Sequence, residues 1–361
     1  MKLEFPPIEA LPQLEGLPPL LRDESGAEIK TPEQWAARRT SLLELVEHYM
    51  WGCGPAYDAP VKGEVLKSEA ALDGAARRDT VRVFYGPEFQ GCFDMEVVFR
   101  DDGRKKPVIT WSLFAANKPC PVERALILER GYVLCSFYRE QMTPDVPGTT
   151  GMAQALYPEY DWGAIRIWAF QHSLAASYLV TQPYADANAL VALGHSRGGK
   201  AALAAGILDP RFAVTAANNS GCGGCGNFRY LGTRDGLTQD PELTECLGCV
   251  AGAFPHWWNP IFPGFGKTQK PYALRDEARL PFDGHTLRAL VAPRALFSSE
   301  GLDDAWANPY GSQMNQKAAQ PVFDLLGVPE NNRLFLREGP HQLGETDWLA
   351  LLDFCDQKFF A

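Results

Sequence analysis

Long apolar runs are absent from this sequence of 361 residues. No stretch reaches the roughly 18 consecutive apolar residues of a membrane-spanning helix, so we expect no membrane span. The N-terminal letters MKLEFPPIEALPQLEGLPPLL are interrupted by prolines and acidic residues, and they lack the apolar segment of a signal peptide. The sequence therefore leaves the localisation unknown: secreted or periplasmic if a leader has been removed, and otherwise cytoplasmic.

Positive charge is scarce as well. The chain has 34 Lys and Arg against 44 Asp and Glu, which gives a formal net charge of -10. Nucleic acids and anionic membranes bind clustered Lys and Arg, and no basic run occurs, so neither is expected as a partner. With 46% hydrophobic and 22% charged residues, the composition is typical of a globular protein with a large core.

Nine cysteines are present, an odd number. Cys222-x2-Cys225 and Cys246-x2-Cys249 are separated by 20 residues, which matches a four-thiolate zinc site. The first pair lies in the glycine-rich letters SGCGGCG, where disulfides or free thiols fit equally well. Zinc, disulfides and free thiols therefore all stay open for these four cysteines.

The N-terminal part of the chain predicts a helix followed by antiparallel strands. The letters TPEQ combine an N-cap threonine, a proline at the first helical position and a capping-box glutamine, so a helix is expected from Pro32 to about His48. Strand-like runs follow near residues 62–67, 79–85 and 94–100. The letters DDGR then indicate a turn.

From Pro107 onward, apolar strands alternate with helical patterns. Such alternation predicts parallel strands with helices on both faces, an α/β fold of three layers around a mostly parallel sheet. The letters FAVTAANNS, APRALFSSE and NRLFLREG add further strands, and DWLALLDFCDQKF closes with a helix. We expect a single domain over residues 1–361, with residues 1–75 as an N-terminal extension and 221–288 as an insertion bordering the active site.

A candidate nucleophile stands in the letters VALGHSRGGKAALAAG, residues 191–206. They contain a G-x-S-x-G motif between an apolar strand and a helix, which is the context of a nucleophile elbow rather than of an ordinary glycine-rich helix start. We therefore expect Ser196 to be the nucleophile and the main-chain N–H of Arg197 to stabilise an oxyanion. A second N–H donor is expected near Phe114 or Ala115.

The general base and its acid should follow the nucleophile in the chain. Of the six histidines, only His341 stands in a loop after a late strand, in the letters EGPHQLGE. The acid should come from the loop after the preceding strand, where Glu300, Asp303 and Asp304 lie together. Asp304 completes a G-x-x-D pattern and is the preferred acid, with Glu300 in reserve.

Four stretches together resemble the glucuronoyl esterases, carbohydrate esterase family fifteen, and their bacterial branch in particular: DWGAIRIWAF, GHSRGGKAALAAGILDPRFAV, NNSGCGG and LPFDGHTLRALVAPRAL. The likeness continues through DDAWANPYGS and GPHQLGETDWLALLDF and covers about residues 107–358. The resemblance implies an α/β-hydrolase fold and a serine esterase that cleaves esters between glucuronic acid of xylan and lignin alcohols.

The resemblance also implies further site residues. Arg197 and Lys200 of SRGGK correspond to oxyanion and sugar contacts, and Trp306 to a tryptophan that packs on the sugar. Trp257 and Trp258 are expected either to line the same cleft or to be core residues under the insertion; we place Trp258 in the substrate site. Many members carry a glutamate as acid where this chain has Asn219, so the later Asp304 has to supply the charge.

Together these observations predict hydrolysis of glucuronate esters, of the 4-O-methyl-glucuronoyl methylesterase type, by Ser196, His341 and Asp304 through an acyl-enzyme. The alternative is an acetylxylan esterase or general carboxylesterase with the same triad. A third possibility is a carbohydrate-binding relative without catalytic activity. We expect a carbohydrate ester as the partner, no metal or organic cofactor, and a monomer.

Overall fold

The computed structural model describes residues 5–114, 121–266 and 277–360. By its internal contacts the chain separates into two units. Unit 1 consists of Met1–Cys53, Asp161–Gly163 and Asn219–Gln342. Unit 2 consists of Gly54–Tyr160, Ala164–Asn218 and Leu343–Ala361. Each unit has its own strands and helices.

The sheet of unit 2 begins antiparallel and continues parallel. Its strands are β1 Lys62–Ala71, β2 Ala76–Tyr85, β3 Gly91–Phe99, β4 Lys106–Leu113, β5 Val133–Tyr138, β6 Ala185–His195 and β7 Phe212–Asn218, in the spatial order β1-β2-β3-β5-β4-β6-β7. The pairs β1–β2, β2–β3 and β3–β5 are antiparallel, whereas β5–β4, β4–β6 and β6–β7 are parallel. Both predictions, the antiparallel start and the parallel continuation, are confirmed.

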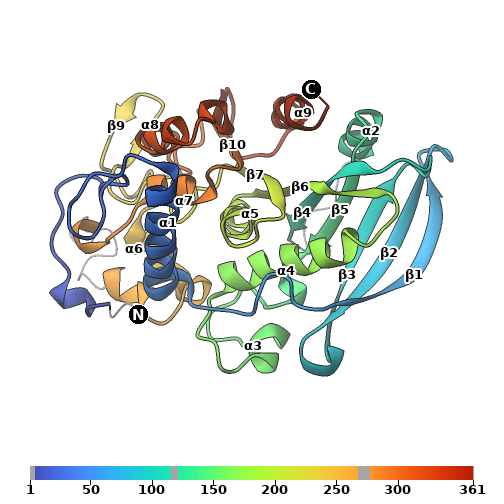
Figure 1. Ribbon diagram of the computed structural model, residues 1–361, viewed down its shortest axis with the longest axis horizontal. Coiled ribbons are helices and arrows are strands. Elements are labelled where there is room, and N and C mark those ends of the chain that lie inside the picture. The colour runs from blue at the N-terminus through green and yellow to red at the C-terminus, as the bar shows by residue number, and fades with distance from the viewer. Residues whose placement is uncertain (1–4, 115–120, 267–276, 361) are drawn as a thin grey trace. The chain divides into compact units, whose positions relative to one another are not determined.

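Helices cover both faces of this sheet. The helices of unit 2 are α2 Pro121–Glu129, α3 Met152–Leu156, α4 Ala164–Leu179, α5 Arg197–Leu208 and α9 Glu345–Phe359, with short 3₁₀ turns at Pro87–Phe89 and Arg139–Gln141. Figure 1 shows α4 and α5 on one side of the strands and α2 and α9 on the other. Every residue of β4 is buried, as expected for a strand with helices on both faces.

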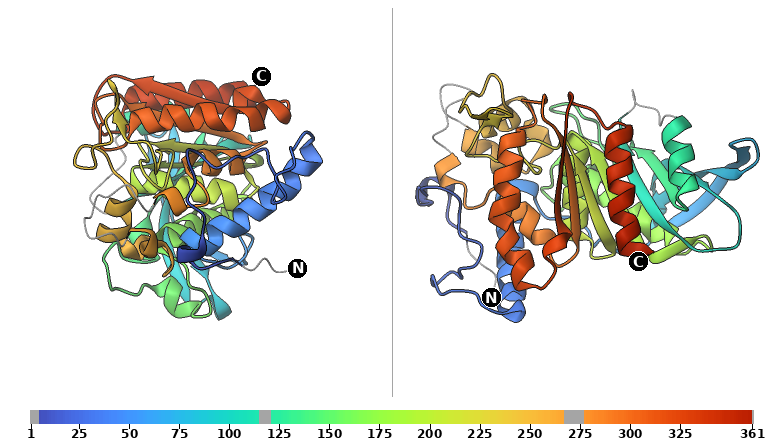
Figure 2. Two further views of the ribbon diagram at one scale, coloured as in Figure 1. Left: turned by 90° about the vertical axis from the view of Figure 1, so that its left-hand side faces the viewer. Right: turned by 90° about the horizontal axis from the view of Figure 1, so that it is seen from above.

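In its described residues, unit 1 combines a parallel strand pair with four α-helices. Its strands are β8 Gly232–Thr233, β9 Gly236–Leu237, β10 Ala295–Gly301 and β11 Asn332–Arg337, and its α-helices are α1 Pro32–Val46, α6 Leu247–Ala253, α7 Gly284–Val291 and α8 Pro309–Leu325. Shorter helical turns lie at Ile8–Ala10, Glu47–Trp51, Pro255–Trp257, Phe262–Gly266, Glu277–Arg279 and Pro329–Asn331. Helix α7 packs against α8, and α8 lies along β10 and β11 (Figure 2). The two strands are parallel, so their carboxyl ends meet at one edge.

The first helix begins where its capping box predicts. The Thr31 hydroxyl accepts from the amide of Gln34 at 3.3 Å, and the Gln34 side chain accepts from the amide of Thr31 at 3.1 Å. Helix α1 ends at Val46 and passes into a π-helical turn, Glu47–Trp51, whose last three residues are buried. The predicted end near His48 thus falls inside this turn.

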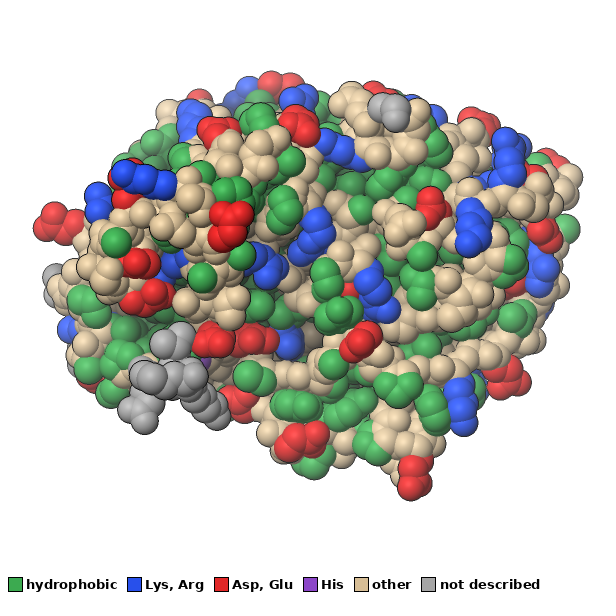
Figure 3. All heavy atoms as spheres, viewed as in Figure 1, with side chains coloured by type: hydrophobic (Ala, Val, Ile, Leu, Met, Phe, Trp, Pro, Cys, Tyr) green, Lys and Arg blue, Asp and Glu red, His purple; other side chains and the backbone are tan. Residues whose placement is uncertain are grey.

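Charges of both signs are interspersed on the surface. In the face drawn in Figure 3, Lys and Arg side chains are scattered among Asp and Glu, with no continuous basic area. Across the three described ranges, no helix combines the length and the apolar character that a membrane crossing requires.

Candidate active site

The serine of the G-x-S-x-G motif occupies a strained turn between β6 and α5. Ser196 has φ 57° and ψ -128°, a backbone conformation that costs of the order of 1–3 kcal/mol in a residue other than glycine. Its amide donates to the carbonyl of Asn218 at 2.9 Å, and its own carbonyl accepts from the amide of Gly199 at 2.8 Å. A Cβ on Gly194 would collide with the carbonyl of Gly198, so the turn requires a glycine there.

A polar network ties the elbow to the start of α9. His195 Nδ1 lies 2.5 Å from Asn218 Oδ1, and Asn218 Nδ2 donates to Asp347 Oδ1 at 3.1 Å. The second oxygen of Asp347, which is 1% exposed, accepts from the amide of Gly344 at 2.9 Å and caps the helix. The His195 ring is therefore engaged with Asn218.

The residues around Ser196 in unit 2 carry two cationic side chains. Arg197 opens α5 and forms an ion pair with Asp145 at 2.8 Å. Lys200 lies one helical turn after Ser196 and is buried, 2% exposed. The ring of Phe114 is 38% exposed and faces the Arg139 guanidinium. Ala115, the other residue considered for a second oxyanion donor, lies outside the described residues.

In unit 1, the carboxyl ends of β10 and β11 bring an acid and a histidine together. Asp304 follows β10 and His341 follows β11. Asp304 Oδ2 lies 2.5 Å from His341 Nδ1. The side chain of Asp304 is 3% exposed, and that of His341 is 38% exposed. A partly exposed imidazole that is oriented by a buried carboxylate has the arrangement of a general base.

Hydrogen bonds keep the Asp304 carboxylate charged. Burial acts to raise its pKa, but the hydrogen bond from His341 and its charge, the Asn219 amide and the Ala307 amide together lower the pKa below its ordinary value. Asn219 Nδ2 donates to Asp304 Oδ2 at 2.5 Å, and Ala307 N donates to Oδ1 at 3.2 Å. The neutral side chain of Asn219 thus donates a hydrogen bond to the Asp304 carboxylate.

The two other candidate acids, one in β10 and one in the loop after it, have different partners. Glu300 is buried in β10, and its Oε1 accepts from the Ser312 hydroxyl at 2.9 Å. Asp303 is half exposed and forms an ion pair with Arg234 at 2.6 Å. Of the three candidates, Asp304 is the one within hydrogen-bonding distance of His341.

Two arginines that the motifs did not single out hold the loop of His341. Arg337 donates to the carbonyls of Glu338 and Pro340 at 3.1 Å each, and also to the carbonyl of Gln342. Arg234, in the turn between β8 and β9, pairs with Glu338 at 2.8 Å as well as with Asp303. The only sequence signal for such a role is that Arg337 ends the strand immediately before the loop.

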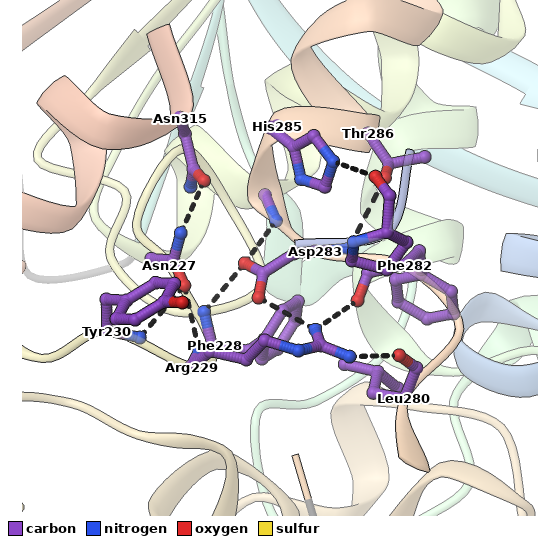
Figure 4. Close-up of polar contacts among 12 residues, drawn as sticks. Asn227, Phe228, Arg229, Tyr230, Leu280, Phe282, Asp283, His285, Thr286 and Asn315 are labelled. Carbon is purple, nitrogen blue, oxygen red and sulfur yellow. Dashed lines mark hydrogen bonds and ion pairs between the residues drawn. The ribbon is translucent and has the colours of Figure 1, made fainter. Parts of the chain in front are cut away.

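The segment that begins with Asn219 is anchored by a buried ion pair. Arg229 Nη1 binds Asp283 Oδ2 and the carbonyl of Phe282, both at 2.9 Å, and Arg229 Nη2 donates to the carbonyl of Leu280. Figure 4 shows these contacts beside the hydrogen bond from Asn227 to Asn315. Segments about 50 residues apart in the chain are thereby locked together, which fixes the loop that carries Asn219.

The three tryptophans expected near the substrate have different environments. Trp306 is 42% exposed and presents its ring to solvent. Trp257 is buried and stacks on Phe254, with ring centroids 3.9 Å apart. Trp258 is also buried, and its Nε1 donates to the carbonyl of Val250 at 3.0 Å. Trp306 is therefore the tryptophan that offers a ring face to a ligand in this unit.

The four cysteines with zinc-like spacing do not converge on one point. Cys246 and Cys249 contact each other, with their sulfur atoms 3.3 Å apart, whereas the Cys225 thiol interacts with Arg288 and Ser220. None of these four cysteines, all within the described residues, forms a disulfide. In the part of the chain that the structure describes, no three His, Cys, Asp or Glu side chains are grouped so that they could hold a metal ion.

Comparison with known proteins supports the resemblance noted in the sequence. Residues 117–327 match the family described as "Glucuronyl esterase, fungi". A carbohydrate esterase from an unknown prokaryotic organism is 29% identical over 92% of this chain and 87% of its own length. A 4-O-methyl-glucuronoyl methylesterase of Schizophyllum commune is 28% identical over 91% of this chain and 77% of its own.

A solved structure agrees with this grouping. A promiscuous esterase of carbohydrate esterase family 15 from a marine bacterial metagenome superimposes with a TM-score of 0.78 and 27% identity, over 97% of this chain and 98% of the other. The predicted α/β-hydrolase fold with a mostly parallel sheet is thereby confirmed.

Proposed function

The protein belongs to the glucuronoyl esterase family, carbohydrate esterase family 15, whose members are carboxylic ester hydrolases, and we propose that it hydrolyses glucuronate esters with Ser196, His341 and Asp304 as its catalytic triad. The main support is the 2.5 Å contact between Asp304 and His341 at the ends of neighbouring strands. The strained backbone of Ser196 supports the same assignment. The chain order of serine, acid and histidine is that of α/β-hydrolases.

The proposed reaction is a two-step acyl transfer. Ser196 Oγ attacks the ester carbonyl while His341 takes the hydroxyl proton, and the resulting imidazolium then gives that proton to the leaving alcohol. Asp304 holds the imidazole in one tautomer and stabilises its positive charge. A water molecule repeats the sequence on the acyl-enzyme and releases the glucuronic acid.

The oxyanion of each tetrahedral intermediate needs hydrogen-bond donors. We assign the main-chain N–H of Arg197 to this role, because it is the first residue of the helix that follows the nucleophile. One such donor elsewhere is worth about 3–4 kcal/mol of barrier lowering. Lys200, one turn further along the buried face of α5, is proposed to bind the uronate or a sugar hydroxyl.

The glucuronate preference rests on relatives and on Trp306. A relative with 28% identity is named as a 4-O-methyl-glucuronoyl methylesterase. The exposed ring of Trp306 offers an apolar platform to a pyranose. A broader carboxylesterase, which also accepts acetyl esters, is the second candidate, because a structural neighbour is described as promiscuous.

The two candidates are separated by substrate competition. Turnover of benzyl and methyl glucuronate is compared with turnover of p-nitrophenyl acetate and acetylated xylan. We expect kcat/KM to favour the glucuronate esters; a preference for acetate would support the second candidate. Ser196→Ala is expected to abolish hydrolysis of every ester, and unchanged hydrolysis in that variant would disprove the triad.

A further inference from the structure

Two cysteines in unit 1, outside the proposed triad, lie in direct contact. The sulfur atoms of Cys246 and Cys249 are 3.3 Å apart, and both residues are free thiols. Cys246 is the N-cap residue of α6, and Cys249 lies three residues later on the same side of the first turn. A small rotation of the side chains would bring the sulfurs within bonding distance.

The two thiols differ in accessibility and in proton affinity. Cys246 is 1% exposed and Cys249 is 8% exposed, so an external reagent reaches Cys249 first. The hydrogen bond between them lowers the pKa of the Cys249 thiol and raises that of the Cys246 thiol. Cys249 is therefore the better nucleophile of the pair, with Cys246 in place to resolve what it forms.

A second pair of cysteines in the chain can be compared with Cys246 and Cys249. Cys222 and Cys225 have the same spacing and are both fully buried. Burial raises the pKa of the Cys225 thiol, which faces Arg288, Glu300 and Ser220. The two pairs thus have the same spacing but different surroundings. Cys246 and Cys249 bring their sulfur atoms into contact, whereas the Cys225 thiol lies beside polar groups.

The dithiol adjoins a residue that joins two loops of unit 1. The amide of Glu245, the residue before Cys246, donates to the carbonyl of Trp306 at 2.9 Å. The Glu245 carboxylate accepts from the amide of Cys222, also at 2.9 Å. A covalent link between Cys246 and Cys249 would restrain the segment that bears Glu245 and so hold both loops more firmly.

We propose that Cys246 and Cys249 are a redox-active dithiol that closes reversibly into an intramolecular disulfide by exchange with a small disulfide such as oxidised glutathione. The Cys249 thiolate, after giving its proton to solvent, attacks one sulfur of the reagent, forms a mixed disulfide and releases one thiolate. Cys246 then loses its proton to solvent and, as a thiolate, attacks the Cys249 sulfur, so that the protein disulfide forms and the second thiolate leaves and takes up a proton. The two protein thiols are oxidised, and the reagent is reduced to two thiols.

The test uses the full-length protein under native conditions. The protein is incubated with oxidised glutathione, its remaining thiols are alkylated after denaturation, and the digest is mapped by mass spectrometry. We expect one cross-link, between Cys246 and Cys249, with loss of two hydrogen atoms and reversal by dithiothreitol. A link through Cys222 or Cys225, a glutathione adduct that persists on Cys249, or no link at all would overturn the proposal.

Two variants control for this assignment. In Cys246→Ser the resolving thiol is missing, so glutathione is expected to stay on Cys249 as a stable adduct. In Cys225→Ser, which changes a thiol of equal spacing, the Cys246–Cys249 link is expected to form as in the wild type. Loss of the link in Cys225→Ser, with the fold intact by circular dichroism, would contradict the pairing. All of these readouts are independent of esterase activity, so they hold whatever ester the protein cleaves.

Discussion

At the scale of single residues, the acid of the proposed triad depends on an amide. Asn219 Nδ2 donates to the Asp304 carboxylate at 2.5 Å. Asn219 therefore contacts the charge that orients His341 in the proposed triad.

Substitution of the acid tests this assignment. Asp304→Asn is expected to lower kcat by roughly 10⁴-fold, because an amide cannot hold the imidazole in the required tautomer or stabilise its charge. Glu300→Gln is the matched control, since that buried acid bonds Ser312 and not His341. We expect kcat of the control to stay near that of the wild type. A larger loss in Glu300→Gln than in Asp304→Asn, measured on folded proteins, would assign the acid to Glu300.

The lowered pKa of Asp304 predicts how stability depends on pH. Hydrogen bonds favour the charged Asp304 carboxylate in the folded protein, so its pKa is lower there than in the unfolded chain. The carboxylate therefore stabilises the fold fully above the ordinary carboxyl pKa of about 4. This stabilisation is lost as the pH falls through the lower pKa of the folded state. Urea unfolding from about pH 6 to about pH 3 should therefore show the stability difference between wild type and Asp304→Asn shrinking with acidity. A difference that grew on acidification would contradict the direction of the shift.

The sequence offers candidate residues for the site but not the partners that hold them. Ser196 and His341 are proposed from a local motif and from chain order, and Asp304 from a short pattern after a strand. The contact between Asn219 and Asp304 joins positions 85 apart, and that between Arg234 and Glu338 joins positions 104 apart. No local pattern encodes such pairs, because they arise only when distant loops meet in the folded chain.

At the scale of elements, the elbow between β6 and α5 requires a particular residue type, a glycine at position 194. Gly194→Ala should destabilise the protein by about 1–3 kcal/mol, because the new Cβ meets the Gly198 carbonyl and the backbone has to move. Esterase activity should fall with it, since that movement displaces Ser196. Urea unfolding and kcat measured on the same preparations test both effects.

Helix α6 offers a control for that substitution. Gly252 has open space where a Cβ would stand, so Gly252→Ala should be tolerated or even stabilise the helix by up to about 1 kcal/mol. If Gly194→Ala behaved like Gly252→Ala, the elbow would not be as tightly packed as the structure indicates.

Elements with strong local signals are also the ones that the sequence predicts. The capping box before α1 and the apolar strands of the parallel sheet are observed as expected. Helix α8 is not among the elements expected from the sequence; it has Pro321 in its interior, and its N-cap, Asn308, has the left-handed φ of 61°. Asn308 adopts this conformation where its side chain donates to the carbonyls of Asn227 and Tyr230. Local signals mark the same start, since the Asn308 side chain also accepts from the amide of Gly311 at 2.8 Å and Pro309 is the first helical residue.

At the scale of the whole molecule, the proposed triad draws on both units. Ser196 belongs to unit 2, whereas Asp304 and His341 belong to unit 1. Each half has its own supports: the network of His195, Asn218 and Asp347 for the elbow, and Arg337 for the histidine loop. The fold class follows from alternating strands and helices, whereas the proposed mechanism requires His341 to activate Ser196.

The most direct test of that requirement is covalent labelling of the serine with a fluorophosphonate. A serine is phosphonylated rapidly only when a base removes its proton, so wild-type protein should be labelled at Ser196 alone. His341→Ala should slow this labelling by at least about 10³-fold, whereas His256→Ala should leave its rate unchanged. Labelling of another serine, or an unchanged rate in His341→Ala, would contradict the triad.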